Sequence, residues 1–326
     1  MSGAATKTAE LESALASLGR EWGRLAARVR TLDHAVTTPC ARLNLRLHYP
    51  PLRDAQATVA ELVSVIKLFI PNFCLPRKEI EEVYARKDKL DAFDFHAELT
   101  ALNGRALDLF MRAQAARGRS GEAGELLLYL LTEWLLEAPQ IVAKMSLKTS
   151  RDMPVHGADG IHVKFLPATG RLVLYSGEAK MHADVGSAVR SAAESIVHAL
   201  SPARMGRELD LVRRDLDLSG LPSGAREALL GYLNPFDERS NQRIDAITCL
   251  LGFDFAGYGE VRSAADADAA FRRLALRQLR LTSAAFSRAL VKAGLSDQAV
   301  ELFLLPLPSV SDFRSLFSEG IGSMPV

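Results

Sequence analysis

Residues 159–180 of the chain read DGIHVKFLPATGRLVLYSGEAK. Two runs rich in Val, Ile, Leu, Phe and Tyr, at 159–166 and 171–180, are separated by the four residues PATG. Two β-prone runs joined by a short connection that contains glycine predict an antiparallel β-hairpin. The stretch therefore predicts a sheet in a chain whose flanking segments have mostly helical patterns.

Three charged residues of this hairpin are expected to meet at one end of it. Glu178 and Lys180 are two residues apart on one strand, so their side chains share a face of the sheet. Antiparallel pairing brings the start of the first strand beside the end of the second, which places Asp159 near that pair. Carboxylates suit Mg²⁺ or Mn²⁺, which activate water at a phosphodiester, and a nearby lysine stabilises the developing negative charge. The alternative is an ordinary exposed ion pair.

A glutamate in the preceding helix extends this acidic group. The apolar run GEAGELLLYLLTEWLL predicts a helix from about Glu122 to Leu136. Glu125 stands among apolar neighbours there, where a carboxylate is costly to bury unless it is paired or bound to a metal. Alternatively, Glu125 lies on the exposed edge of the helix or complements its positive N-terminal end.

The flanking segments predict a mixed α/β chain. Helical spacing of apolar residues predicts helices near 5–32, 54–69, 77–117, 185–200, 204–218, 224–233, 265–294 and 311–319. Alternating or continuous apolar runs predict further strands near 41–49, 141–147, 247–258 and 301–308. We therefore expect a mainly helical N-terminal region, residues 1–110, that docks a partner. A mixed sheet flanked by helices is expected to follow in residues 111–326.

Composition excludes several classes of protein. The 40 Lys and Arg residues nearly balance the 39 Asp and Glu residues, for a net charge of +1. Because a free-standing DNA-coating protein is strongly basic, contact with DNA would need a local patch or a partner. The three cysteines form no CxxC pair, which argues against a zinc or dithiol site and suits a reducing cytoplasm. No apolar run approaches the roughly 20 residues that cross a bilayer, and no P-loop motif is present.

The order of the candidate residues resembles a nuclease superfamily. A helix glutamate, a strand aspartate and E-x-K on the next strand resemble the PD-(D/E)xK pattern of restriction-endonuclease-like folds, here Glu125, Asp159 and Glu178-Ala179-Lys180. Longer stretches are similar to the HamA subunit of the Hachiman anti-phage defence system and to the related AbpA defence protein. These stretches are GELLLYLLTEWL, PQIVAKMSLKTS, HGADGIHV and LYSGEAK. One departure is that Ala158, and not proline, precedes the aspartate.

This resemblance implies an α/β fold with a restriction-endonuclease-like core and a Mg²⁺- or Mn²⁺-dependent DNA endonuclease. It implies that Asp159 and Glu178 bind the metal, that Glu125 completes the acidic cluster, and that Lys180 serves the attacking water. It further implies a superfamily 2 helicase subunit, HamB or its counterpart, as the partner that controls DNA cleavage in the bacterial cytoplasm.

Basic and histidine residues outside this cluster are candidates for contact with DNA. Residues 271–292 hold basic residues and no acidic residue, and several of the arginines share a helical stripe that suits phosphates or an acidic partner. The stripe contains Arg273, Arg277, Arg280 and Arg288. Flanking the proposed site are Lys144, Lys148, His156, His162 and His182. The alternative for the arginines and lysines is a solvated surface position, which we also expect for Arg20, Arg24 and Arg28 in the first helix.

Two other functions stay open at this level. A non-catalytic DNA-binding adaptor that regulates the helicase would use the same fold without cleavage. The presence of all four catalytic-type residues favours a nuclease over this adaptor. An RNA-directed nuclease toxin with the same core is the second alternative, and competition between DNA and RNA substrates separates it from a DNA endonuclease.

Overall fold

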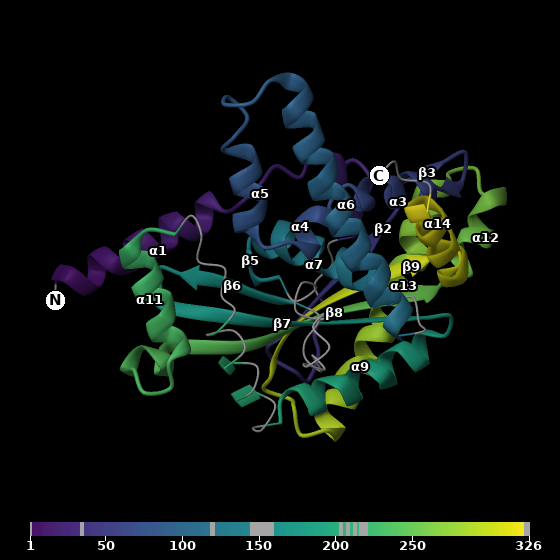
Figure 1. Cartoon of the computed structure of the whole chain (residues 1–326). Coiled ribbons are helices and arrows are strands. Elements are labelled where there is room, and N and C mark those ends of the chain that lie inside the picture. Colours follow the sequence, from purple (N-terminus) through teal and green to yellow (C-terminus); the bar gives the residue numbers. More distant parts are fainter. Residues whose placement is uncertain are drawn as a thin grey trace.

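A seven-stranded mixed sheet forms the centre of the part of the chain that the computed structural model describes (Figure 1). The described residues are 2–32, 36–117, 121–143, 160–201, 205–206, 209–210, 214 and 221–322. The strands are β1 (Arg30–Leu32), β2 (Leu43–Tyr49), β5 (Gln140–Val142), β6 (Ile161–Leu166), β7 (Arg171–His182), β8 (Arg243–Asp254) and β9 (Ala299–Leu307). Their order across the sheet is β1-β2-β9-β8-β7-β6-β5. Short strands β3 (Leu52–Arg53) and β4 (Gln56–Ala57) pair separately.

Helices cover both faces of this sheet (Figure 1). In the N-terminal part they are α1 (Ser2–Ser17), α2 (Gly23–Ala26), α3 (Val59–Lys67), α4 (Ile70–Cys74), α5 (Arg77–Tyr84), α6 (Ala92–Arg117) and α7 (Glu122–Leu136). Later helices are α9 (Val185–Ala199), α11 (Ser223–Leu233), α12 (Gly257–Glu260), α13 (Ala267–Lys292) and α14 (Val310–Gly322), with 3₁₀ turns η1 (Glu238–Gln242) and η2 (Val261–Ser263). None of the described helices combines the length and the apolar character needed to cross a membrane.

The predicted hairpin is confirmed as β6 and β7. Leu166 pairs with Arg171 beside the turn, and Ile161 pairs with Ser176 at the far end. Gly170 closes the turn with a φ of +64°, a left-handed conformation that glycine adopts without a steric penalty. Beyond the hairpin, β7, β8, β9 and β2 are parallel neighbours, whereas β5 and β1 are antiparallel to theirs.

Strand alternation divides the core between the two faces of β7. Val173 and Tyr175 pack in the cluster that contains α7, α3, α6 and α14. Leu172 and Leu174 pack on the other face with α1 and α11. On that second face, α9 and α13 cover the neighbouring strands β8 and β9. Side chains at even-numbered positions of β7 therefore point away from α7.

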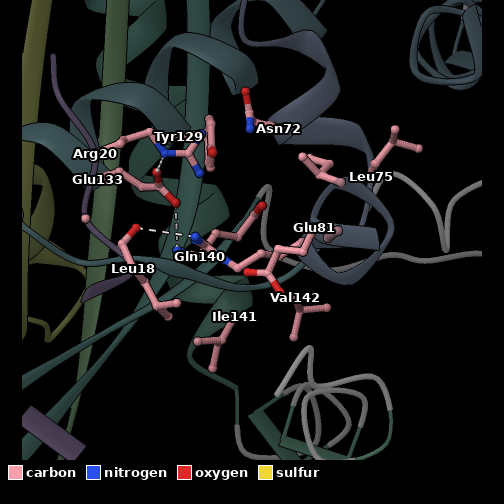
Figure 2. A pocket seen from close by; sticks show the side chains of 14 residues that line it. Leu18, Arg20, Asn72, Leu75, Glu81, Tyr129, Glu133, Gln140, Ile141 and Val142 are labelled. Atoms are coloured by element: carbon pink, nitrogen blue, oxygen red, sulfur yellow. Dashed lines mark hydrogen bonds and ion pairs between the residues drawn. The ribbon is translucent and has the colours of Figure 1, made fainter. Parts of the chain in front are cut away.

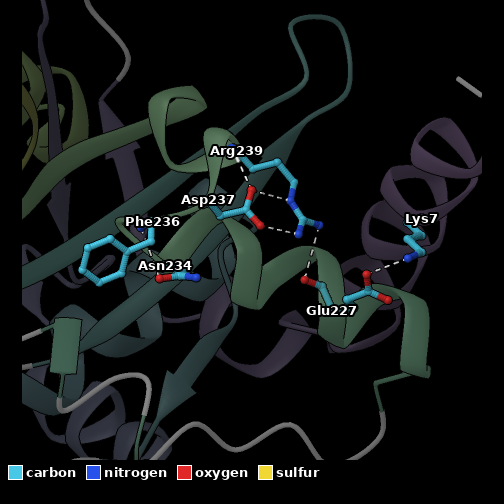
Figure 3. A network of polar contacts seen from close by, with 6 residues as sticks. All are labelled: Lys7, Glu227, Asn234, Phe236, Asp237 and Arg239. Atoms are coloured by element: carbon cyan, nitrogen blue, oxygen red, sulfur yellow. Dashed lines mark hydrogen bonds and ion pairs between the residues drawn. The ribbon is translucent and has the colours of Figure 1, made fainter.

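Polar contacts join α1, α11 and η1 at one end of the molecule (Figure 3). Lys7 of α1 lies 2.6 Å from a carboxylate oxygen of Glu227 on α11. Arg239 donates to both carboxylate oxygens of Asp237, at 3.0 and 2.6 Å, and these bonds lower the pKa of Asp237 to about 2. Gly231 leaves room for this guanidinium, because a Cβ at that position would lie 2.2 Å from Arg239 Cζ.

The prediction of one helix over residues 5–32 is wrong. Helix α1 ends at Ser17, α2 spans one turn, and Arg30–Leu32 pair with β2 as strand β1. The stretch GREWG supplies two glycines that weaken a helix, and pairing with β2 is a non-local interaction that periodicity does not show. The strand predicted over 41–49 is confirmed as β2, which lies between β1 and β9.

The sheet therefore includes strands from both predicted regions of the chain, and the boundary after residue 110 stays a prediction. The general expectation of a mixed sheet flanked by helices is confirmed. The helix predicted near 204–218 lies mostly outside the described residues.

Candidate functional site

Glycines bring α7, β6 and β7 into close contact at the far end of the hairpin. A Cβ on Gly124 of α7 would lie 2.9 Å from Met181 Cγ and 3.5 Å from Ala179 Cβ. Gly177 donates its backbone N–H to the carbonyl oxygen of Gly160 at 2.9 Å. The first turn of α7 therefore rests directly on the end of β7 that carries Glu178 and Lys180.

Glu178 and Lys180 form an ion pair on β7. Lys180 Nζ lies 2.5 Å from Glu178 Oε1, and the two side chains are 23% and 17% exposed, respectively. As predicted, they share one face of the strand, and this is the face turned away from α7. The parallel register places them beside Cys249 and Leu251 of β8. The pair is thus shielded more than an ordinary exposed ion pair, yet it stays accessible from solvent.

Glu125 is buried in the first turn of α7, with 4% of its surface exposed, and Glu122 is fully buried in the same turn. This burial excludes the interpretation that Glu125 lies on an exposed helix edge. The positive end of the helix stabilises carboxylates at this position. The described residues contain no group of three or more metal-ligating side chains. Asp159 lies outside them, so its predicted place in the cluster stays a prediction. Glu125 and Glu178 are not brought together on one face, because α7 covers the side of β7 opposite to Glu178.

Cationic groups gather around His182 at the end of β7. Burial, followed by the charges of Arg314 and Lys180, lowers the pKa of His182 although Asp184 acts in the opposite direction. Arg314 of α14 donates to the carbonyl oxygen of Met181 at 2.9 Å. A neutral imidazole beside two cations can donate its one N–H to a phosphate oxygen. The sequence reasoning missed Arg314, because nothing near it in the sequence connects it to β7.

The predicted DNA-contacting residues other than His182 fall into three groups. Lys144, Lys148 and His156 lie outside the described residues. His162 is wrong as a phosphate contact, because it is 2% exposed and its Nδ1 lies 2.9 Å from the Ala138 carbonyl oxygen. The third group is exposed on α13 and consists of Arg273, Arg277, Arg280 and Arg288.

Helices α9 and α13 pack together over one face of the sheet. The arginine stripe lies on the outer side of α13, away from that face. Arg273, Arg277 and Arg288 form no ion pair with any other described residue. This is the same sheet face from which Glu178 and Lys180 project. Exposed cations without a counter-ion on this face leave a local positive charge on a chain of nearly zero net charge.

Arg20 is not the solvated residue that its helical spacing predicted. Its Nε lies 3.1 Å from Glu133 Oε2, and the Glu133 side chain is only 3% exposed. The other oxygen of Glu133 accepts the backbone N–H of Gln140 at 3.0 Å. Figure 2 shows Arg20 beside Glu133, next to Tyr129. The segment between α1 and α2 is thereby tied to the helix that carries Glu125.

Comparison with known families adds one finding. The family model described as HamA matches residues 28–321. This range contains α7, the β6–β7 hairpin and α13. No curated protein matches the chain.

Proposed function

The chain belongs to the HamA family, which implies a role in Hachiman anti-phage defence, and we propose that it is the DNA-cleaving subunit of that system. The activity proposed is Mg²⁺- or Mn²⁺-dependent endonucleolytic hydrolysis of DNA phosphodiester bonds. A superfamily 2 helicase subunit is the proposed partner and controls access to DNA. The observation that carries the proposal is the shielded Glu178–Lys180 pair at the end of β7, while the buried Glu125 lies on the other side of that strand, in the first turn of α7.

The donor set fits a hard divalent cation. Glu178 supplies carboxylate oxygens, which Mg²⁺ and Mn²⁺ prefer over nitrogen or sulfur ligands. With Asp159, Glu178 would hold the ion, whereas Glu125 belongs to α7, which covers the opposite face of β7. When bound, the ion would polarise the scissile phosphate and lower the pKa of the attacking water.

The neighbouring cations have separate roles in this proposal. Lys180 is held at 2.5 Å from Glu178, so its ammonium stands where it can orient water and stabilise negative charge on the phosphate. His182 is neutral near pH 7 because its pKa is lowered, and it can donate one hydrogen bond to a phosphate oxygen. Arg314 adds positive charge beside it.

The arginine stripe of α13 is the proposed path for the DNA backbone. Arg273 and Arg288 are 15 residues apart in the sequence, which corresponds to about 22 Å along a helix that rises 1.5 Å per residue. One DNA strand carries a phosphate about every 3.4 Å of the helix axis, so the stripe is long enough to contact several. The alternative occupant of this stripe is an acidic surface of the helicase.

Cleavage of plasmid and linear DNA, with the helicase, ATP and Mg²⁺ present, tests the proposal. Glu178→Gln and Lys180→Ala are expected to retain less than about 1% of the wild-type rate, a loss typical of groups that act directly on the reacting phosphate. Glu137→Gln is a control outside the site, because Glu137 forms an exposed ion pair with Lys164 at 3.2 Å. Absence of wild-type cleavage, even with Mn²⁺, would favour the adaptor, and preferred cleavage of RNA would favour the toxin.

A further inference from the structure

A groove lies between α1, the C-terminal end of α7 and the turn end of the β6–β7 hairpin. Its volume is about 820 Å³, within the range of about 300–1,000 Å³ that is usual for ligand pockets. Lys164 lines the groove and pairs with Val173 of β7. Glu178 is five positions beyond Val173 on that strand, which corresponds to about 16 Å at 3.3 Å per residue. The groove is therefore separate from the Glu178–Lys180 pair.

Both tryptophans of the chain line this groove, and they differ in their surroundings. Trp22 stacks on Phe69 with 5.7 Å between ring centroids, and the Arg20 guanidinium lies 5.9 Å from the Trp22 centroid. Trp134 forms no ring or cation–π contact with any other described residue. It is only partly buried, so its indole is accessible in the groove. Tryptophan attracts a cation more strongly than the other aromatic residues do.

The charge that stays without a partner in the groove is negative. The two basic side chains that line it each pair with a glutamate at or near the end of α7, at 3.1 and 3.2 Å. Glu12 and Glu21 also line the groove and are exposed. Neither forms an ion pair with any other described residue. Two free carboxylates therefore share the groove with an accessible indole, which favours a cationic occupant.

We propose that this groove binds an arginine-containing segment of a partner protein. The planar guanidinium of such a segment would stack on Trp134 and pair with the carboxylates of Glu12 and Glu21, since arginine makes both kinds of contact. Leu15 and Pro167 also line the groove and would contact the aliphatic part of the arginine side chain. An acidic segment would instead place like charges together. The proposal does not depend on the nuclease activity proposed above.

Calorimetric titration of the full chain with a short arginine-rich peptide tests this binding. The matched peptide carries citrulline in place of arginine, which keeps the planar shape of the side chain and removes its charge. The citrulline peptide is expected to bind at least about tenfold more weakly. Equal binding of the two peptides, no binding of either, or tighter binding of the free polyamine spermidine overturns the proposal.

Tryptophan fluorescence in the same titration locates the peptide. Because both tryptophans line the groove, bound peptide is expected to change their emission with the dissociation constant that calorimetry gives. Trp22→Phe leaves Trp134 as the single tryptophan and is expected to keep this change. Binding without a change in emission, or loss of the change in Trp22→Phe, overturns the proposal.

Two double variants separate the groove from general electrostatic attraction. Glu12→Gln with Glu21→Gln is expected to weaken binding of the arginine peptide about tenfold, because it removes both free carboxylates. Glu260→Gln with Glu319→Gln is the matched control. Both control residues are exposed, lie outside the groove and form no ion pair with any other described residue, and the change in net charge is the same. Equal weakening in the two double variants overturns the proposal.

Discussion

The ion pair between Arg20 and Glu133 couples two parts of the chain, and its partners are unequally buried. The side chain of Arg20 is 22% exposed, whereas that of Glu133 is 3% exposed. Each single substitution removes one charge and leaves the other without its counter-ion. Arg20→Met leaves the more deeply buried carboxylate, whereas Glu133→Gln leaves the more exposed guanidinium. We therefore predict that Arg20→Met destabilises the fold more than Glu133→Gln does.

The separation of the charges sets the scale of this effect. At 3.1 Å, the attraction is at most about 5 kcal/mol with an effective dielectric constant of 20. Arg20→Met leaves a nearly inaccessible carboxylate without its counter-ion, which predicts a loss in unfolding free energy of about 3–4 kcal/mol. Glu133→Gln leaves a guanidinium that can regain contact with water, which predicts a loss of about 1.5–2.5 kcal/mol. The double variant should lose less than the sum, with a coupling of about 1–3 kcal/mol.

Urea denaturation of the full chain, followed by circular dichroism, measures these losses. Glu137→Gln is again the matched control, since its carboxylate is 82% exposed in the pair with Lys164 and is expected to contribute less than about 0.5 kcal/mol. The reasoning is refuted if Arg20→Met loses no more stability than this control. It is equally refuted if Glu133→Gln proves the more damaging of the two substitutions.

Three further predictions concern other parts of the molecule. The double substitution Arg273→Glu and Arg277→Glu on α13 should weaken DNA binding and reduce the slope of log K against log[salt] by about 2, whereas reversal of the exposed Lys87 should leave that slope unchanged. Burial, followed by the charge of Arg46, lowers the pKa of His48 to about 3. Below about pH 6.5, this histidine is therefore protonated in the unfolded chain but stays neutral in the native protein. The wild type should therefore lose about 2 kcal/mol from this residue between pH 6.5 and 4.5, and urea denaturation at both pH values should find that loss missing in His48→Leu. Gly177→Ala should cost about 1–2 kcal/mol in urea denaturation, because its Cβ would lie 3.2 Å from a leucine of α7 and 3.3 Å from the backbone nitrogen of Gly160. An unchanged stability would mean that α7 moves freely on the sheet.

Local patterns predicted the central elements of the fold well. The helix expected from about Glu122 to Leu136 has those bounds, and the PATG connection forms the turn of the β6–β7 hairpin. Both depend on residues close together in the sequence: an apolar run that ends before a proline, and a short glycine-containing connection between two β-prone runs. The shared face of Glu178 and Lys180 was predictable for the same reason, since alternation along a strand is a property of its own backbone.

Patterns failed where a distant segment decides the environment of a residue. Arg20 was expected on a solvated helix surface, but Glu133, more than 100 positions later, binds it. His162 was expected near phosphates, but its ring is buried against Tyr129 and the Ala138 carbonyl. Arg314 had no signal in the sequence, and it reaches β7 only because α14 packs beside that strand's end.

The sequence by itself determined helix α7 and the β6–β7 hairpin, the alternation that places Glu178 beside Lys180, and the resemblance that indicates the HamA family. Tertiary structure alone decided which charged groups are buried, which partners they have, and where β1 and β2 join the sheet. The physical reason is that backbone periodicity depends on neighbours in the chain. Burial and electrostatic environment depend instead on segments that packing brings together from anywhere along it.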